Sequence, residues 1–518
     1  MIMKRIIVVL ALLAFVRLAD AERINQEGRI LGTLPAVTNS ILLNTTNADA
    51  VIAAMQIFPV TSPYNEDVSR LPVLANSDAM MARITTNFNG VSRTLRVNAE
   101  NNYVLVPTNQ RLVQINLATY PDSDLNGGTL PYGLYPIPTN LPVEPWPFTT
   151  PTQTIQQWQT NDDGSDRHAI IVEPGANTIW ETYETLLSGT NWQANIGAMF
   201  NMNTNQIRGN GVETGSADTA GLAIFPMLVR YDECERGMVE HACSVSVEYP
   251  YSTGTLGDSS AYIYPATSTI VLKGYNDPAY PKMGQRLRLK ASFVISNSWT
   301  IEEKALLLGL KKYGAFVADR AAAFFIEITA DDRWPTNAFN DIRNIAITNM
   351  EAIQSTGVNE GPRSPGAPVA NAGADQSLPI FQTAQLNGSV SFTGTPPAIQ
   401  WKLYSGPGTV TFGDAAQTNT TASFSVPGIY TLELSADDGV HAVAYDAAVF
   451  TVADAISVAI ARIGTNVSLT WTGGSAPFVV QSVNGLPAGS WSRVVTTSVQ
   501  NVVLPITNQM QFFRVQSQ

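Results

Sequence analysis

The part of the chain whose fold is most tightly constrained by its sequence begins at residue 369. Residues 369–453 contain short runs in which apolar and polar residues alternate, such as Ile399–Leu403 and Tyr430–Ala436. Alternation with a period of two is typical of a β-strand that buries one face. Turn signals separate the runs, including Pro427-Gly428 and Asp437-Asp438-Gly439. The pattern predicts a sandwich of two antiparallel sheets.

Several motifs of this segment occur in the order seen in the PKD domain family, which the segment resembles. These motifs are Ala372–Gln376, Leu386–Ser389, Trp401, Gly406–Gly408, Pro427–Leu432 and Asp437–Gly439. The resemblance implies an immunoglobulin-like β-sandwich without catalytic activity, used as a spacer or adhesion module. We expect Trp401 and Tyr430 to be core aromatic residues on facing sheets.

A second, smaller module is predicted after this one. Residues 455–518 alternate in the same way, as in Val467–Trp471 and Phe478–Ser482. They resemble the small fibronectin-III-like domains that close many large exported bacterial proteins. A Gly- and Pro-rich stretch at 356–368 reads as the linker between these modules and the rest of the chain.

Residues 22–355 form one large region in which strand patterns prevail and helices are few. We expect a mainly β fold here, a large jelly-roll-like sandwich. Three helices are predicted: one from the capping box at Thr300–Glu303 to Tyr313, one over 338–353, and a short one from Asn76 to about Ile84. Segments such as Asp166–His168, Leu228–Glu233 and Arg286–Phe293 resemble an uncharacterised family of exported bacterial proteins.

The chain begins with the three parts of a secretory signal peptide. Lys4 and Arg5 precede an apolar stretch over 6–16, and Ala19-Asp20-Ala21 is a small-residue cleavage site. We expect cleavage after Ala21, because the apolar stretch is shorter than the roughly 20 residues that cross a bilayer; an uncleaved anchor is the alternative. No later stretch is longer, so the sequence predicts a secreted or cell-surface protein, not an integral membrane protein.

Charge and cysteine content narrow the possible partners and the redox state. The formal net charge is −12 and no run of basic residues occurs, so the electrostatics disfavour nucleic acid as a partner.

The two cysteines, Cys234 and Cys243, lie close together in a chain predicted to be exported. This favours a disulfide between them; two buried free thiols are the alternative.

Candidate catalytic residues are the two histidines of the large region, His168 and His241, with Asp218 and Asp232. Histidine is the usual general acid or base near neutral pH, and a pair of carboxylates can hydrolyse glycosidic bonds. No spacing motif joins the four residues, so ordinary structural hydrogen bonds are the alternative.

Arg286, Arg288 and Lys290 alternate with apolar residues, which places all three cations on one face of a strand. Like charges repel unless a ligand or carboxylates lie opposite. The face is therefore a candidate binding site for an anionic polysaccharide. The alternative is an internal ion-pair ladder with Asp218, Asp232 or Asp319.

Two further segments could hold a ligand. Asp122, Asp124 and Asn126 match the start of a calcium-binding loop, although the loop lacks the final glutamate; calcium is the one cofactor indicated. Residues 131–151 are rich in proline and aromatic residues and contain a single charge, Glu144. We interpret them as an extended strap over the sandwich.

These observations favour an exported modular protein that binds extracellular polysaccharide and could also process it. The alternative is a non-catalytic structural or adhesive protein of the cell surface. The two hypotheses differ in one place. A polysaccharide site requires the cationic face to line an open cleft near His168 or His241, whereas a structural role buries those cations in carboxylate pairs.

Overall fold

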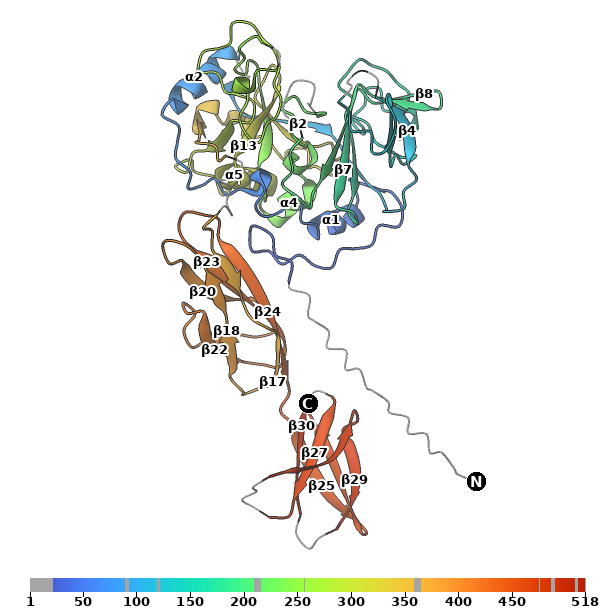
Figure 1. Cartoon of the computed structure of the whole chain (residues 1–518), viewed down its shortest axis with the longest axis vertical. Helices are drawn as coiled ribbons and strands as arrows, with labels where there is room; N and C mark the ends of the chain where they lie inside the picture. The colour runs from blue at the N-terminus through green and yellow to red at the C-terminus, as the bar shows by residue number, and fades with distance from the viewer. Residues whose placement is uncertain are drawn as a thin grey trace, which may run out of the picture.

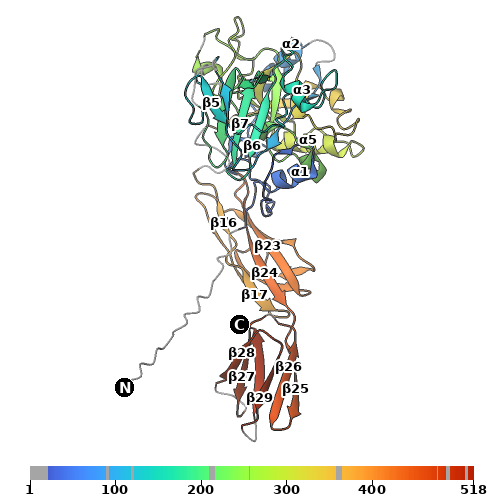
Figure 2. The same ribbon diagram turned by 90° about the vertical axis from the view of Figure 1, so that its right-hand side faces the viewer.

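The computed structural model describes residues 22–88, 93–117, 119, 122–208, 216–255, 257–357, 365–474, 476–485, 490–507 and 511–517. The predicted signal peptide and most of the predicted linker, residues 358–364, lie outside the described residues. The chain is mainly β and contains several sheets, as the sequence predicted. The large region lies at one end and two β-sandwich modules follow it along the longest axis (Figure 1 and Figure 2).

One half of the large region, the first lobe, is built on a six-stranded sheet. Its order is β15 (Met350–Ala352), β12 (Arg286–Leu289), β13 (Ala315–Arg320), β11 (Cys243–Val247), β14 (Phe325–Thr329) and β2 (Arg96–Asn101). Strands β11 and β13 are parallel, and so are β14 and β2. A jelly roll is antiparallel throughout, so the connectivity differs from the predicted arrangement. Parallel strands require long crossovers, and the connection from β11 to β13 contains α5 (Ile301–Lys312).

The other half, the second lobe, contains two smaller sheets. A five-stranded sheet has the order β1 (Ile41–Leu42), β3 (Val104–Leu105), β6 (Ala169–Glu173), β7 (Thr178–Tyr183) and β10 (Ile196–Asn201). A four-stranded sheet has the order β5 (Tyr132–Tyr135), β4 (Val113–Asn116), β9 (Asn191–Gln193) and β8 (Leu186–Ser188). Figure 1 shows the two lobes side by side, with β2 between them.

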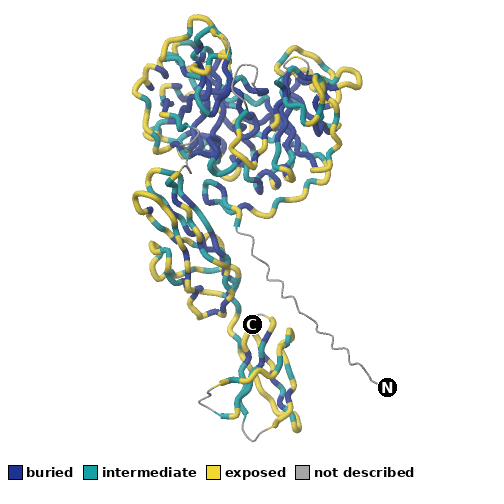
Figure 3. Tube along the Cα trace, in the orientation of Figure 1, coloured by how far each residue is buried: buried dark blue, intermediate teal, exposed yellow. Residues whose placement is uncertain are grey.

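Strand β6 explains how the two lobes are joined. Its residues Ile170 and Val172 enter the main core, which extends into the first lobe, whereas Ala169 and Ile171 enter a second core under the four-stranded sheet. Successive strand residues point to opposite faces, so a continuous apolar run can serve two cores. Buried residues accordingly run through both lobes in Figure 3.

Two of the three predicted helices are confirmed. Helix α5 begins with the expected capping box between Thr300 and Glu303. Helix α2 (Ser77–Asn87) also forms, although the Asn76 side chain donates to Pro278 O rather than capping it. The other α-helices in the described part of the chain are α1 (Thr46–Ala53), α3 (Ile155–Gln159) and α4 (Tyr231–Arg236).

The helix predicted over 338–353 is wrong. The segment contains two 3₁₀ turns, Ile342–Asn344 and Ile347–Asn349, followed by β15. Asn and Asp side chains compete for local backbone groups, and here Asn349 donates to Ala346 O. The backbone of Ile345 also bonds to a distant segment of the protein: its carbonyl oxygen accepts a hydrogen bond from the backbone N–H of Leu95.

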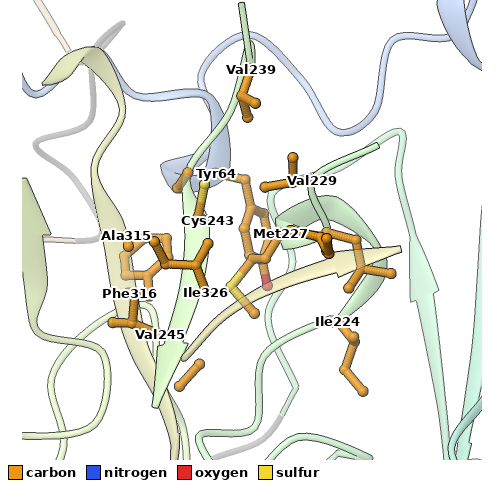
Figure 4. Packing of buried hydrophobic residues seen from close by; sticks show 14 of the residues in the cluster. Tyr64, Ile224, Met227, Val229, Val239, Cys243, Val245, Ala315, Phe316 and Ile326 are labelled. Atoms are coloured by element: carbon orange, nitrogen blue, oxygen red, sulfur yellow. The ribbon is translucent and has the colours of Figure 1, made fainter. Parts of the chain in front are cut away.

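The disulfide predicted between Cys234 and Cys243 is not formed: both residues are free thiols. Cys234 lies on α4 and Cys243 begins β11, and each side chain packs inside the main core with no exposed surface. Figure 4 shows Cys243 among Tyr64, Val239 and Ala315. Here each cysteine acts as a small apolar side chain.

Neither thiol should react with iodoacetamide in the folded protein, because burial raises the pKa of both thiols well above the usual range. Unfolding in urea without reductant should expose two reactive thiols, counted as adducts by mass spectrometry. Failure of unfolded, unreduced protein to react would instead indicate that the two residues form a disulfide.

The first C-terminal module consists of β16–β24. Its strands are β16 (Val369–Asn371), β17 (Gln376–Pro379), β18 (Ala384–Asn387), β19 (Ser389–Ser391), β20 (Ala398–Ser405), β21 (Val410–Phe412), β22 (Asn419–Phe424), β23 (Gly428–Asp437) and β24 (Ala444–Ala453). A four-stranded sheet, β17-β24-β23-β20, and a three-stranded sheet, β18-β22-β21, enclose the core. Trp401 and Tyr430 are both buried in it, as expected, but they lie on the same sheet. The aromatic residue facing Tyr430 is Phe424, with ring centroids 4.7 Å apart.

The second module is a sandwich of two three-stranded sheets, β25-β26-β29 and β28-β27-β30. Its strands are β25 (Ser457–Ile463), β26 (Asn466–Thr472), β27 (Phe478–Val483), β28 (Ser492–Thr497), β29 (Asn501–Pro505) and β30 (Phe512–Ser517). Leu469, Trp471, Phe478 and Val480 form the centre of a small core.

The first module is tied directly to the large region. Arg70 donates to both carboxylate oxygens of Asp437 at 2.6 and 2.8 Å, and the backbone N–H of Ile30 donates to Tyr404 Oη at 3.0 Å. Gly28 has φ of 75°, and a β-carbon there would lie 2.9 Å from the ring of Tyr445. The close approach and the positive φ both favour glycine at this position.

Candidate functional site

A pocket of about 570 Å³ lies between the two lobes. Strands β2, β11, β13 and β14 line it from the first lobe, and β7 and β10 line it from the second. Its polar walls include Glu100, Asn101, Asp166, His168, Tyr183, Asp218, Asp319 and Glu327. We call this the interlobe pocket; it brings together two of the four predicted catalytic residues, His168 and Asp218.

Strands β2, β13 and β14 carry the carboxylates of the first lobe that form one wall of the pocket. Strands β2 and β14 pair in parallel with Glu327 opposite Asn98. The register shifts between Ile328 and Thr329, which leaves Glu100 without a partner in the ladder, and both Glu100 and the next residue, Asn101, line the pocket. Asp319 lies near the end of β13 and completes this wall.

Asp218 reaches the same pocket from a loop rather than a strand. Its Oδ1 accepts from Ala220 N at 2.6 Å, a local turn that fixes the carboxyl group. The next residue, Thr219, donates from its hydroxyl to Asp319 Oδ1 at 2.6 Å. The loop is thus attached to β13 beside the carboxylate wall.

His168 is held by Glu144. The ring Nδ1 lies 2.5 Å from Glu144 Oε2, the backbone N–H of His168 donates to the same oxygen at 2.9 Å, and Nε2 lies 3.1 Å from Ala217 O. Burial lowers the pKa of His168, but the Glu144 carboxylate more than offsets this and raises it to about 10. Both ring nitrogens therefore donate, and His168 is a cation at neutral pH that cannot serve as a general base.

Four carboxyl groups of the pocket, those of Glu100, Asp218, Asp319 and Glu327, have raised pKa values. Burial, and then the nearby Glu144 carboxylate, raise the pKa of Glu100 to about 7. Burial and Asp319 raise the pKa of Asp218, and burial and Glu100 raise that of Glu327, both well above the usual range. Burial also raises the pKa of Asp319. Part of this cluster consequently carries protons at neutral pH.

His241 and Asp232 lie elsewhere, in a buried network around Glu233. His241 Nε2 lies 3.0 Å from Glu233 Oε2, and its Nδ1 lies 2.9 Å from Ala242 O. Glu233 also pairs with Arg230, while Asp232 pairs with Arg236. The four predicted catalytic residues are therefore not one site, and His241 has the partners of a structural histidine.

The predicted cationic face is not an open cleft. Arg286, only 2% exposed, donates to Pro63 O at 2.6 Å, lies 3.8 Å from the Glu66 carboxylate, and stacks on Phe316. Arg288 donates to Glu351 Oε1 at 2.7 Å and to the carbonyls of Val68 and Leu71. The ion-pair alternative fits these two arginines, although their partners are Glu66 and Glu351 rather than the three aspartates considered. Lys290 is half-buried beyond the end of β12.

Replacing Arg288 by alanine should lower the free energy of unfolding by about 2 kcal/mol, because two buried carbonyls and Glu351 lose their donor. Lys290→Ala, two residues along, should change it by less than about 0.5 kcal/mol. Urea unfolding followed by circular dichroism measures both variants. Equal stability of Arg288→Ala and wild type would contradict the structural role.

The predicted calcium ligands point to protein partners. Asp124 Oδ2 accepts from Met199 N at 2.8 Å and lies 3.1 Å from Arg208 Nε, while Asn126 Nδ2 donates to Leu134 O at 2.7 Å. Arg208 donates to the backbone carbonyl of Asp122 at 2.8 Å. Throughout the described part of the chain, no group of three or more His, Cys, Asp or Glu residues could hold a metal ion.

Sequence reasoning missed Glu100, Glu144 and Glu327. Glu144 had a visible signal, since it is the single charge in the proline-rich segment 131–151. Glu327 lies between Ile326 and Ile328 in a buried strand, where a carboxylate requires a reason. Glu100 had no comparable signal, because its strand alternates without a strong apolar face.

A second pocket, of about 310 Å³, lies in the second lobe and contains none of the predicted site residues. Asn116, Arg167, Gln193 and Asn195 are among its lining residues. Within the described residues, no helix is long and apolar enough to span a membrane.

No family model and no curated protein match the chain. Similar solved structures include the PKD domain from KIAA 1837 protein, which is 23% identical with a TM-score of 0.16 and covers 20% of this chain and 93% of that one. The D00-D0 domain of intimin is 14% identical with a TM-score of 0.18, over 29% of this chain and 86% of that one. The N-terminal eight Ig domains of Down Syndrome Cell Adhesion Molecule are 15% identical with a TM-score of 0.18, over 33% of this chain and 30% of that one. Each is a likeness of fold over part of the chain.

Proposed function

We propose that the chain is an exported, non-catalytic adhesive protein of the cell surface that contacts an extracellular partner through the interlobe pocket. The observation that carries this proposal is that the two arginines of β12 are buried and paired with carboxylates. Arg286 and Arg288 are buried in pairs with Glu66 and Glu351, as a structural role requires, and do not line a cleft for an anionic polysaccharide.

The arrangement of the modules supports an adhesive role. The two sandwiches follow the large region in line, and the Arg70–Asp437 pair ties the first of them to it. The interlobe pocket lies between β2 and β7, on strands of the large region and away from both modules. Such a chain presents one recognition site at the end of a stalk.

Glycan processing is a second candidate function, favoured by Glu100. A carboxyl group with its pKa raised to about 7 can act as a general acid near neutral pH, and glycoside hydrolysis needs such an acid and a second carboxylate. Asp218, Asp319 and Glu327 line the same pocket and could supply the second group.

One set of assays separates the two functions. The mature chain from Glu22 is tested for binding to a glycan array and to intact cells, and for release of reducing ends from soluble polysaccharides. Binding without sugar release supports the adhesive proposal. Sugar release that is lost in Glu100→Gln, with folding retained, would replace it with the processing function.

A further inference from the structure

We infer that the interlobe pocket binds an organic cation, an ammonium or guanidinium group carried on an apolar or sugar framework. The inference deepens the proposed function, on which it rests, by naming the chemistry of the group that the partner presents. It follows from the acidic residues that line the pocket, from two buried acceptors without a hydrogen-bond partner, and from the aromatic and apolar residues of the walls.

Most ionisable groups of the pocket are acidic. Five carboxyl groups line it: Glu100, Asp166, Asp218, Asp319 and Glu327. Among the described lining residues only His168 and Arg320 are cationic. His168 is held by Glu144, and Arg320 is exposed, donates to Glu248 O at 2.9 Å and lies over Tyr249. The five carboxyl groups therefore outnumber the cationic side chains of the described lining.

Two acceptors of the wall have no hydrogen-bond partner. Asn101, only 4% exposed, has an unpaired Oδ1, and Glu327 has an unpaired Oε2. The two residues lie on β2 and β14, which pair with each other. Buried polar atoms in folded proteins are nearly always paired, so unpaired acceptors on a pocket wall point to a ligand that donates hydrogen bonds.

The remaining walls favour an organic cation over a metal ion. Within the described residues, no group of three or more His, Cys, Asp or Glu side chains is arranged to hold a metal ion, and this includes the carboxyl groups of the pocket. Tyr183 is half-buried in the pocket, and its ring centroid lies 5.4 Å from that of His168, so an aromatic ring already lies beside a cation here. Ile196, Ile224 and Ile270 supply apolar surface for the carbon framework.

Isothermal titration calorimetry of the mature chain tests the inference with two pairs of probes. Butylguanidine is compared with its neutral isostere butylurea, and glucosamine with N-acetylglucosamine. We expect binding of at least one cation and of neither neutral partner. A cation preference confined to glucosamine identifies an amino sugar as the source, whereas one confined to butylguanidine identifies an arginine-like side chain.

Variants locate the site. Glu327→Gln and Asp218→Asn each remove a carboxyl group that can ionise when it pairs with a bound cation, with little change in shape, and should each weaken binding by about tenfold or more. Glu235→Gln, at an exposed residue of α4 outside this pocket, should leave affinity within about twofold. Circular dichroism checks folding, and Glu327→Gln alone suffices if Asp218→Asn does not fold.

Equal binding of charged and neutral probes, no binding of any probe, or unchanged affinity in the folded pocket variants would overturn the inference. Cell binding by the same preparations separates the two proposals. Adhesion that persists without cation binding removes only the inference, whereas cation binding without any adhesion removes only the proposed function.

Discussion

Replacing Glu233 by alanine is expected to lower the free energy of unfolding by about 3–5 kcal/mol, because it breaks a buried ion pair from one side. Glu233 is 2% exposed and pairs with Arg230, which is 3% exposed. Without Glu233, the guanidinium of Arg230 stays buried with only the carbonyls of Phe225 and Leu228 as acceptors. His241 loses its carboxylate partner in the same step.

Glu235→Ala is the matched control, since Glu235 is exposed on the same helix, two residues away. Its stability should lie within about 0.5 kcal/mol of wild type. Urea unfolding monitored by tryptophan fluorescence gives both values. A folded Glu233→Ala protein of wild-type stability would mean that the network contributes little, and would reopen a catalytic role for His241 and Asp232.

The C-terminal modules could be predicted because their evidence is local. Alternation within Tyr430–Ala436 and the turn at Pro427-Gly428 specify a strand and its beginning without reference to distant residues. The pairing of strands is not local, which is why Trp401 and Tyr430 were placed on facing sheets although β20 and β23 are neighbours in one sheet.

The fold of the large region was harder to predict, because it too depends on pairing between strands that are distant in the sequence. The run Ala169–Glu173 is consistent with any buried strand, and nothing in it shows that its two faces serve different cores. The parallel pairing of β11 with β13 depends on a crossover that includes α5. Sheet order of this kind is decided by packing between segments far apart in the sequence.

Prediction of the candidate site from the sequence was limited in a similar way. Period-two spacing correctly placed Arg286 and Arg288 on one strand, but their partners come from Glu66 and Glu351, far away in the sequence. His168 was found as a histidine before a strand, yet its charge state depends on Glu144 in another segment. Residue type was visible in the sequence, whereas electrostatic environment was not.

Raising the pH from 5 to 8.5 is expected to destabilise the protein by about 3 kcal/mol or more, an effect opposite to that of ordinary salt-bridged carboxylates. Burial raises the pKa of Glu181 to about 7, although the backbone N–H groups of Ile224 and Phe225 oppose the shift. Glu100 also has a pKa raised to about 7, by burial and by Glu144. Both groups ionise in the unfolded chain at their ordinary, lower pKa.

The sign follows from proton counting. Between the unfolded and folded pKa values the folded protein binds more protons, so stability falls as pH rises through about 7. His168, with its pKa raised to about 10, acts in the same direction: its stabilising contribution is complete below its unfolded pKa and is lost at higher pH. Glu233 has the opposite effect at low pH, because Arg230 and His241 outweigh burial and lower its pKa to about 2. Stability should therefore be greatest near pH 5.

Urea unfolding at pH 4, 5, 7 and 8.5 measures this profile. Glu100→Gln should flatten the decline between pH 5 and 8.5, because glutamine keeps a donor toward Glu144 but cannot ionise. Glu184→Gln, exposed outside the pocket, should leave the slope unchanged. A wild-type protein that gains stability between pH 5 and 8.5 would show that the carboxyl groups of the interlobe pocket are ionised and paired. That outcome would contradict the raised pKa values of Glu100 and Glu181 on which the expected pH dependence rests.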